Sequence, residues 1–311
     1  MIEYNIVDIL ISIVLSLIMF GIGLSLTVQN FRNVLLYPKP ILTGLTAQMV
    51  ALPIIAFTFC FFSDLQPEFK VGLIILSVCP GGTTSNFITY LLNGNTALSV
   101  SMTTINSFLT LFSIPFIVNI ALTYFLGSGT EFNLPYLETI LQIFFITIIP
   151  ATIGIFINVK LPKLARKLNS QINIPFGILK KMKFNFIKSF TIVLLGIVFA
   201  IKLFASEGSG GAGLTKNDFV QLLPIGLLFN LTGLFFGYIV SLLLKLKDRT
   251  PMTIGIEVGL QNTTLAFLVA GTLLHNTEMQ KPALVYAFFS FWTAILFGLF
   301  ARYLKSKKYV S

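Results

Sequence analysis

Long apolar segments fill most of this chain of 311 residues. A membrane hydrocarbon core of about 30 Å needs roughly 20 consecutive apolar residues per helix, and the chain supplies such segments repeatedly. Only helices and closed barrels satisfy their backbone polar groups in lipid, and runs such as 9–19 lack the alternation of a barrel strand. We therefore predict an all-α polytopic membrane protein with nine transmembrane helices, at about 6–27, 41–62, 69–93, 96–126, 136–158, 188–204, 219–245, 251–275 and 280–304.

The composition excludes the main soluble classes. Apolar residues make up 55% of the chain and charged residues only 10%, whereas a soluble domain needs about 25% charged residues to wet its surface. Disordered chains, nucleic-acid-binding folds and soluble enzymes are excluded together. No nucleophile elbow, HExxH, P-loop or Rossmann motif is present, so we do not expect an enzyme. The two cysteines lie in apolar segments and offer no disulfide framework or metal-ligand spacing.

Basic residues predict the orientation. With the N-terminus outside, 17 of the 21 Lys and Arg residues fall on the inner side, which is the distribution of a positive-inside protein. We therefore predict a multi-pass protein of the cell (plasma) membrane, with its N-terminus outside and its C-terminus cytoplasmic. Glu3 and Asp8 stand where a signal peptide would be basic, so the first segment is expected to be a retained helix. Lys202 lies at a helix end, where it can extend to the interface.

The connection 159–187 is the longest between predicted spans, and it is basic and partly apolar. A solvated linker that obeys the positive-inside rule is one interpretation. A segment that lies on the inner membrane surface against anionic lipid is the other.

Two predicted spans are interrupted by polar residues in the same way. Residues 79–86 read CPGGTTSN, and residues 257–264 read EVGLQNTT, each between apolar segments. A simple proline kink would explain either one alone, but non-helical backbone in lipid persists where it lines a cavity or site. The two occupy matching positions in two repeats, 1–126 with four spans and 127–311 with five, and the second repeat is inverted. Paired interruptions in inverted repeats indicate the site of a secondary transporter.

Glu257 is the most informative single residue. A carboxylate within a span costs at least ~2.5–3.5 kcal/mol, and the spans offer it no basic partner. It must be protonated, hydrated in a cavity, or neutralised by a bound cation. Hard neutral oxygens accompany it and favour a small hard cation over a soft metal. These oxygens belong to Gln48, Ser85, Asn86, Thr103, Gln261 and Asn262.

Three further polar or aromatic residues are weaker candidates. His275 is expected to be a wetted interfacial residue rather than a ligand. Asn106 is expected to hydrogen-bond a neighbouring helix. Trp292 falls in the middle of its predicted span, where it packs in the bundle or lines a cavity.

At these residues the sequence resembles the bile acid:sodium symporter family. Residues 79–86 followed by ALSVSMTT at 97–104 are similar to its first signature, and EVGLQN at 257–262 followed by Leu265-Ala266 is similar to its second. The resemblance implies inverted repeats with two crossing broken helices. It also implies a core domain, here about 41–126 plus 219–304, and a panel domain, about 1–40 plus 136–204. The chain resembles a nine-helix form that lacks the first helix of the ten-helix members.

The resemblance also implies the binding residues. A first sodium ion would be held by Ser85, Asn86, Ser99, Thr103 and Glu257. A second would be held by Gln48, Glu257, Gln261 and the backbone carbonyls of Val258 and Leu260. Thr83 and Asn262 would face the substrate.

We therefore predict a sodium-coupled symporter of an organic anion that works by alternating access. The family carries bile acids, steroid sulfates and small carboxylates, and the sequence leaves the choice open. A proton-coupled transporter with Glu257 as the proton site is one alternative. A channel-like or sensor membrane protein without coupled transport is the other.

Overall fold

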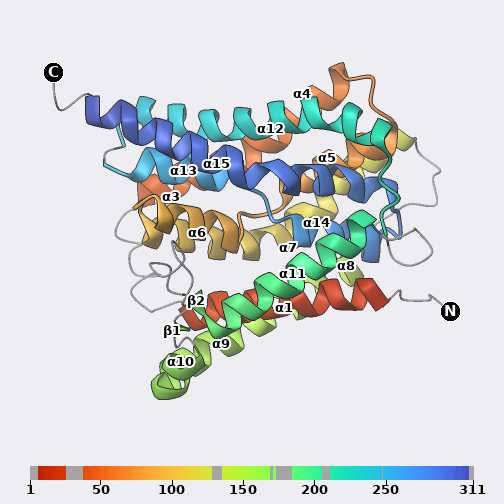
Figure 1. The fold of residues 1–311 in the computed structure, drawn as a ribbon. Coiled ribbons are helices and arrows are strands. Elements are labelled where there is room, and N and C mark those ends of the chain that lie inside the picture. The colour runs from red at the N-terminus through yellow and green to blue at the C-terminus, as the bar shows by residue number, and fades with distance from the viewer. Residues whose placement is uncertain are drawn as a thin grey trace.

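The computed structural model describes residues 6–25, 38–127, 135–168, 171–172, 184–204, 211–246 and 248–307. Within these ranges the regular secondary structure is helical apart from one antiparallel pair of two-residue strands, β1 and β2. The long helices run between two ends of a bundle, and α1 begins at one end while α15 finishes at the other (Figure 1). The first half contains α1 (Ile6–Ser25), α3 (Pro38–Thr46), η1 (Ala47–Ala51), α4 (Leu52–Phe62), α5 (Pro67–Val78), α6 (Thr83–Leu91) and α7 (Thr96–Leu126). The second half contains α8 (Tyr136–Ile143), η2 (Phe144–Ile148), α9 (Ile149–Lys160), α10 (Pro162–Leu168), β1 (Gln171–Ile172), β2 (Phe184–Asn185), α11 (Phe186–Phe204), α12 (Lys216–Leu243), α13 (Thr250–Gly259), α14 (Thr263–Phe267), η5 (Leu268–Leu273), η6 (Glu278–Gln280) and α15 (Lys281–Lys307).

The chain is an all-α membrane protein with several spans. Seven described helices are long and apolar enough to cross a membrane, and the bent pair α5–α6 raises this number to eight. The sixth predicted span coincides with α11, a helix of 19 residues. The full number of nine spans stays a prediction.

Local sequence explains where several helices begin. Proline lies in the first turn of α5 and α13, where its missing N–H has no intrahelical partner to lose. In α4 and α9 the proline instead follows directly on the π-helical segments η1 and η2. Asn95 caps α7 by accepting a hydrogen bond of 3.1 Å from the Leu98 amide. Thr215 and Asp218 form a reciprocal capping box at the start of α12, which satisfies two amides that would otherwise lack partners.

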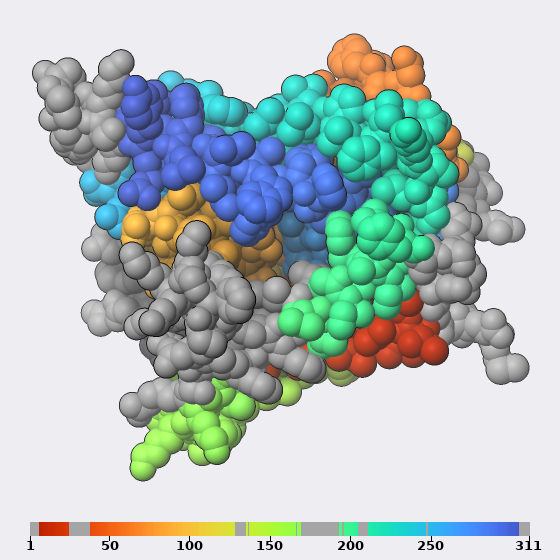
Figure 2. All heavy atoms as spheres, viewed as in Figure 1, coloured from red at the N-terminus to blue at the C-terminus, as the bar shows by residue number. Residues whose placement is uncertain are grey.

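The helices form two groups. In the smaller group, α1 packs on α9 and α11. In the larger group, α12 packs on α13 and α15, and α5 packs on α4 and α7. Figure 1 shows α1, α9 and α11 together on one side of the bundle, and Figure 2 shows α11 lying across α1. The division into a panel and a core domain follows these groups but stays a prediction.

Glycines bring the two most intimately packed helices together. A Cβ on Gly233 or Gly237 of α12 would meet the backbone of α13, at the carbonyls of Val258 and Ile254 respectively. A Cβ on Gly255 of α13 would lie 2.7 Å from the Leu234 carbonyl of α12. Small residues at such crossings let helix backbones approach closely, which drives association where water is absent.

Charged side chains are more deeply buried than the sequence indicated. Lys202 on α11 was expected to extend to the interface, but it is 3% exposed and lies 3.6 Å from the Asp8 carboxylate on α1. Lys281 at the start of α15 is also buried, 3.0 Å from Asp218 of α12. The interhelical pairing explains the correction, because each ammonium finds a carboxylate on a neighbouring helix. Asp8 lies in the first turn of α1, so Glu257 is not the only acidic residue on a membrane-spanning helix.

Two further predictions were wrong. Trp292 was expected to be in the bundle or a cavity, but it is 64% exposed and lies on the outer surface of α15. The helix is rotated so that Thr293, the next residue, is directed toward α12 instead. Asn106 is fully buried, yet neither of its side-chain atoms has a hydrogen-bond partner within the described part of the chain.

Candidate functional site

The first interruption bends a helix sharply. α5 ends at Val78, α6 begins at Thr83, and the two helices are bent by 58°. Pro80 cannot donate a backbone hydrogen bond, so the helix cannot continue through it undisturbed. Gly81, the next residue, lies against the site: a Cβ there would lie 2.2 Å from Oε2 of Glu257. Only a glycine lets this backbone approach the carboxylate.

The second interruption lies between α13 and α14. The three residues 260–262 are non-helical, while 250–273 as a whole remains long and apolar enough for one span. Asn262 caps α14 by accepting a 3.1 Å hydrogen bond from the Leu265 amide. The backbone N–H of Asn262 donates a 2.9 Å hydrogen bond to the Pro80 carbonyl. The two interruptions therefore meet, backbone to backbone.

Glu257 lies in the last turn of α13, beside this meeting point, and is fully buried. Its Oε1 accepts hydrogen bonds from Ser85 of α6, at 3.0 Å, and from Ser99 of α7. Its Oε2 accepts one from Thr103 of α7, at 3.1 Å. Three hydroxyls from two other helices thus converge on one carboxylate.

Asn86 completes this group of side chains. Its Oδ1 lies 2.7 Å from Ser99 Oγ and 3.4 Å from Thr103 Oγ1. All five residues predicted for a first sodium ion are therefore brought together. In the ranges described, no Lys, Arg or His forms an ion pair with Glu257, and no cluster of three or more His, Cys, Asp or Glu is found. One carboxylate among neutral oxygens is a donor set that fits a small hard monovalent cation.

The residues predicted for a second ion also lie near one another. Gln48, in the π-helical turn η1, donates a 3.5 Å hydrogen bond to Oε1 of Gln261. Gln261 in turn donates to the Val258 carbonyl at 2.7 Å. Gln48 is buried, and its own Oε1 has no hydrogen-bond partner among the described residues. Leu260, the last of this set, is buried in the second interruption.

The two residues predicted to face substrate flank the meeting point. Thr83 begins α6 and is half-buried. Asn262 is buried, with its Nδ2 unpaired within the described ranges. His275, the weak candidate, is exposed, as expected for an interfacial residue.

Sequence reasoning missed a polar group on the other side of the second interruption. Asn230 of α12 donates a 2.7 Å hydrogen bond to the carbonyl of Gly259, the last residue of α13. Tyr286 and Thr293 of α15 hydrogen-bond with Asn230. A single asparagine in the middle of an apolar span was the available signal.

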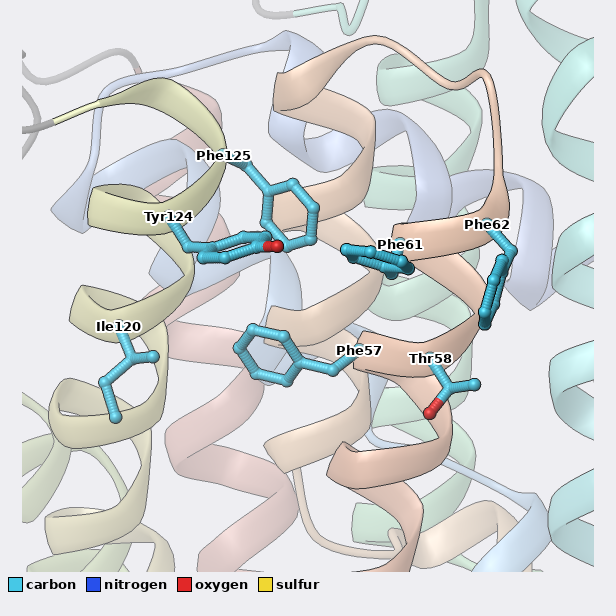
Figure 3. A pocket seen from close by; sticks show the side chains of 7 residues that line it. All are labelled: Phe57, Thr58, Phe61, Phe62, Ile120, Tyr124 and Phe125. Atoms are coloured by element: carbon cyan, nitrogen blue, oxygen red, sulfur yellow. The ribbon is translucent and has the colours of Figure 1, made fainter.

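Two of the cavities formed by the described residues lie outside this site. One of about 680 Å³ lies between α1 and the segment α8–α9, and Asp8, Ser12, Gln142 and Thr272 supply polar groups to its lining. The other, of about 300 Å³, is an aromatic groove between α4 and α7 (Figure 3). It is lined by Phe57, Thr58, Phe61, Phe62, Ile120, Tyr124 and Phe125. Neither cavity is lined by a residue of the Glu257 group.

Known proteins share this sequence pattern. The model of the sodium bile acid symporter family matches residues 12–208, which is more than half of the chain. An uncharacterized sodium-dependent transporter of Bacillus subtilis, YocS, is 29% identical over 96% of this chain and 83% of its own length.

Similar proteins also occur in plants and animals. The probable sodium/metabolite cotransporter BASS1 of Arabidopsis thaliana, a chloroplastic protein, is 29% identical over 87% of this chain and 61% of its own length. The human ileal sodium/bile acid cotransporter is 27% identical over 95% of this chain and 79% of its own length.

Proposed function

The chain belongs to the sodium bile acid symporter family, and we propose that it is a sodium-coupled symporter of an organic anion that works by alternating access. Membership of this family, together with the relatives, makes the chain a sodium-dependent solute transporter rather than an enzyme. In the proposed architecture nine spans form inverted repeats, 1–126 and 127–311. A panel domain (about 1–40 plus 136–204) moves against a core domain (about 41–126 plus 219–304) that contains both interruptions.

One observation carries the proposal: the fully buried carboxylate of Glu257 on α13 lies among three hydroxyls and an amide oxygen that come from two other helices, α6 and α7. A buried carboxylate without a basic partner is costly in a span unless a cation neutralises it. In the proposed first site, sodium is held by Glu257, Ser85, Asn86, Ser99 and Thr103. The hydroxyls that now donate to the carboxylate would turn their oxygens toward the ion.

The proposed second site uses Gln48, Gln261, Glu257 and the carbonyls of Val258 and Leu260. The unpaired Oε1 of Gln48 supports it, because a buried amide oxygen without a donor is itself unfavourable. The Gln261 amide currently donates to the Val258 carbonyl. A cation that binds here would take the place of this donor. Two ions per cycle would share the one carboxylate.

For the substrate we propose an organic anion at the meeting point of the two interruptions. Thr83 lies at the N-terminal end of α6, and Asn262 lies at that of the helical run 263–273. Helix N-termini carry partial positive charge and favour a carboxylate or sulfate group. The unpaired Nδ2 of Asn262 supplies a further donor. A bile acid, a steroid sulfate and a small carboxylate all carry such a group.

For the orientation we propose a cell-membrane location with the N-terminus outside and the C-terminus inside. The distribution of basic residues supports it, since 17 of 21 then face the cytoplasm. Part of the basic connection 159–187 lies outside the described residues. The two interpretations of that connection, a solvated linker and a segment on anionic lipid, therefore both stay open.

The rival is a proton-coupled transporter, favoured by the full burial of Glu257 and by the absence of a paired basic side chain in the described ranges. Thermal stability of the purified protein in detergent separates the two. A ligand that binds the folded state raises the unfolding midpoint by mass action, so sodium should stabilise while potassium and choline at equal ionic strength should not. Equal midpoints in all three salts would refute sodium binding, and a channel or sensor would show no sodium-driven accumulation of labelled anions in liposomes.

A further inference from the structure

The carbonyl of Gly259 ends a half-helix inside the bundle. The last four carbonyls of a helix lack intrahelical partners, and in a membrane interior water is not available to replace them. Ile256 recovers its partner from the Leu260 amide, at 3.0 Å. Val258 accepts a hydrogen bond from Gln261, as described above. Gly259 finds its partners on two other helices.

Four hydrogen bonds connect Gly259, Asn230, Tyr286 and Thr293. Asn230 donates one amide proton to the Gly259 carbonyl at 2.7 Å and the other to the hydroxyl of Tyr286 at 3.0 Å. The Tyr286 hydroxyl donates its proton to the same Gly259 carbonyl. Thr293 Oγ1 lies 2.5 Å from Asn230 Oδ1 and donates to it. We refer to Asn230, Tyr286 and Thr293 as the carbonyl clamp.

The Gly259 carbonyl decides which way the side-chain amide of Asn230 faces. A carbonyl can only accept, so it must meet the NH₂ group, and the amide oxygen is left to accept from Thr293. The ring of Tyr286 is itself packed between Phe229 and Phe289, with ring centroids 6.1 and 5.5 Å away. Asn230 and Tyr286 are both fully buried. The clamp is therefore a rigid and fully connected polar network.

The clamp holds the peptide that joins α13 to the interruption. Leu260 is extended, with φ −112° and ψ 114°, so the carbonyls before and after it point to opposite sides. The clamp draws the Gly259 carbonyl toward α12 and α15, which leaves the Leu260 carbonyl directed away from those helices. Val258 and Leu260, the two carbonyls of the proposed second sodium site, flank the clamped group on either side.

We propose that Asn230, Tyr286 and Thr293 are positioning residues for the second sodium site. They hold the Gly259 carbonyl out of the ion path and so fix the Val258 and Leu260 carbonyls as ligands. Fixed carbonyls bind an ion more tightly than mobile ones because less freedom is lost on binding. This inference rests on the proposed function, since it needs sodium at that site. Through the clamp, α12 and α15, which carry none of the predicted sodium ligands, contribute to ion binding by holding the backbone carbonyls in place.

The test compares four variants of the full chain, purified in detergent. Sodium titrations followed by thermal unfolding give the half-saturating sodium concentration of each. Tyr286→Phe and Thr293→Val should raise it about three- to tenfold, which is the value of one hydrogen bond lost from the network. Thr293→Ser keeps the hydroxyl and should stay within about twofold of the unmodified chain. Ser241→Ala is the matched control, because Ser241 is buried on α12 and bonds only within its own helix, to Gly237.

The outcomes separate a positioning role from a structural one. A purely structural network would lower the unfolding midpoint in sodium-free buffer and leave the half-saturating sodium concentration unchanged, and that result would overturn the proposal. Equal behaviour of Thr293→Val and Thr293→Ser would also overturn it, and this pair remains informative if Tyr286→Phe does not fold. If sodium fails to stabilise the unmodified chain, the proposed function fails first. If sodium stabilises the unmodified chain and every variant has the same half-saturating sodium concentration, the positioning role of the clamp is refuted and the proposed function is not.

Discussion

The backbone amide of Asn262 lies 2.9 Å from the carbonyl of Pro80 and donates a hydrogen bond to it. These residues are 182 positions apart in sequence, and each lies in the middle of an interrupted helix. Pro80 cannot donate a hydrogen bond, but its carbonyl still needs a donor, and the other interruption supplies one. The two breaks therefore satisfy each other, and the Glu257 carboxylate lies beside the point where they meet.

Replacement of the buried carboxylate should abolish sodium dependence. Both proposed sodium sites share Glu257, so Glu257→Ala removes the only negative charge from them. We expect sodium-stimulated uptake of labelled organic anions into liposomes to disappear, together with stabilisation of the detergent-purified protein by sodium. Glu138→Ala is the control, because Glu138 is exposed on α8. Wild-type sodium stimulation in Glu257→Ala would refute both ion sites.

Loss of one neutral ligand should weaken sodium binding without abolishing it. Ser99→Ala removes a hydroxyl that contacts both Glu257 and Asn86, and Gln48→Ala removes an amide from the second site. One such contact is worth about 0.5–1.5 kcal/mol, so the half-saturating sodium concentration should rise about 2- to 12-fold. Sodium titrations of uptake measure this value. An unchanged value for Ser99→Ala would contradict the first site alone.

Addition of a methyl group at the α12–α13 crossing should destabilise the larger helix group. A Cβ at Gly255 would lie 2.7 Å from the Leu234 carbonyl, so one helix must move. Overpacking of this kind costs about 1–3 kcal/mol. We expect Gly255→Ala to lower the unfolding midpoint, while Gly196→Ala, where no atom of the described residues would contact the new Cβ within 4 Å, should keep or slightly raise it, because alanine is the better helix former. Equal midpoints for the two variants would show that the crossing is not tightly packed.

The pair formed by Asp8 and Lys202 should behave as a buried ion pair. Removal of one partner leaves an uncompensated buried charge, which costs about 3–5 kcal/mol, whereas removal of both costs less. Lys202→Met and Asp8→Asn should each lower the unfolding midpoint, and the double variant should be more stable than either. A double variant with the summed loss of the two single variants would show that the side chains do not interact.

Thiol labelling should report the proposed orientation. Single cysteines at Lys216 and Lys167 lie on exposed positions at opposite ends of the predicted topology. With the N-terminus outside, Lys216→Cys should react with an impermeant reagent in intact cells. Lys167→Cys should react only after permeabilisation. The reverse pattern would show that the N-terminus is inside, which refutes the proposed orientation but not the proposed binding sites. Cys60 and Cys79 are buried, so the unmodified chain is the background control.

Much of the fold could be predicted from the sequence, because the signal for a membrane helix is local. Hydrophobicity is a property of consecutive residues, so spans such as 96–126 were predicted to the residue. The interruptions at 79–86 and 257–264 were predicted for the same reason, since proline, glycine and polar residues break a helix wherever it lies. The one charged residue among neutral oxygens also marked Glu257 as the centre of a site.

Only the tertiary structure decided which side chains meet. Ser85, Ser99 and Thr103 reach Glu257 across 154 to 172 residues, and that convergence depends on how each helix is rotated and where it crosses its neighbours. Rotation placed Thr293 against Asn230 and left Trp292 exposed, although the two residues are adjacent in sequence. It also buried Lys202 against Asp8. Apolar spans carry little information about rotation, because lipid and the bundle interior accept the same side chains, so packing and polar pairing between helices determine it.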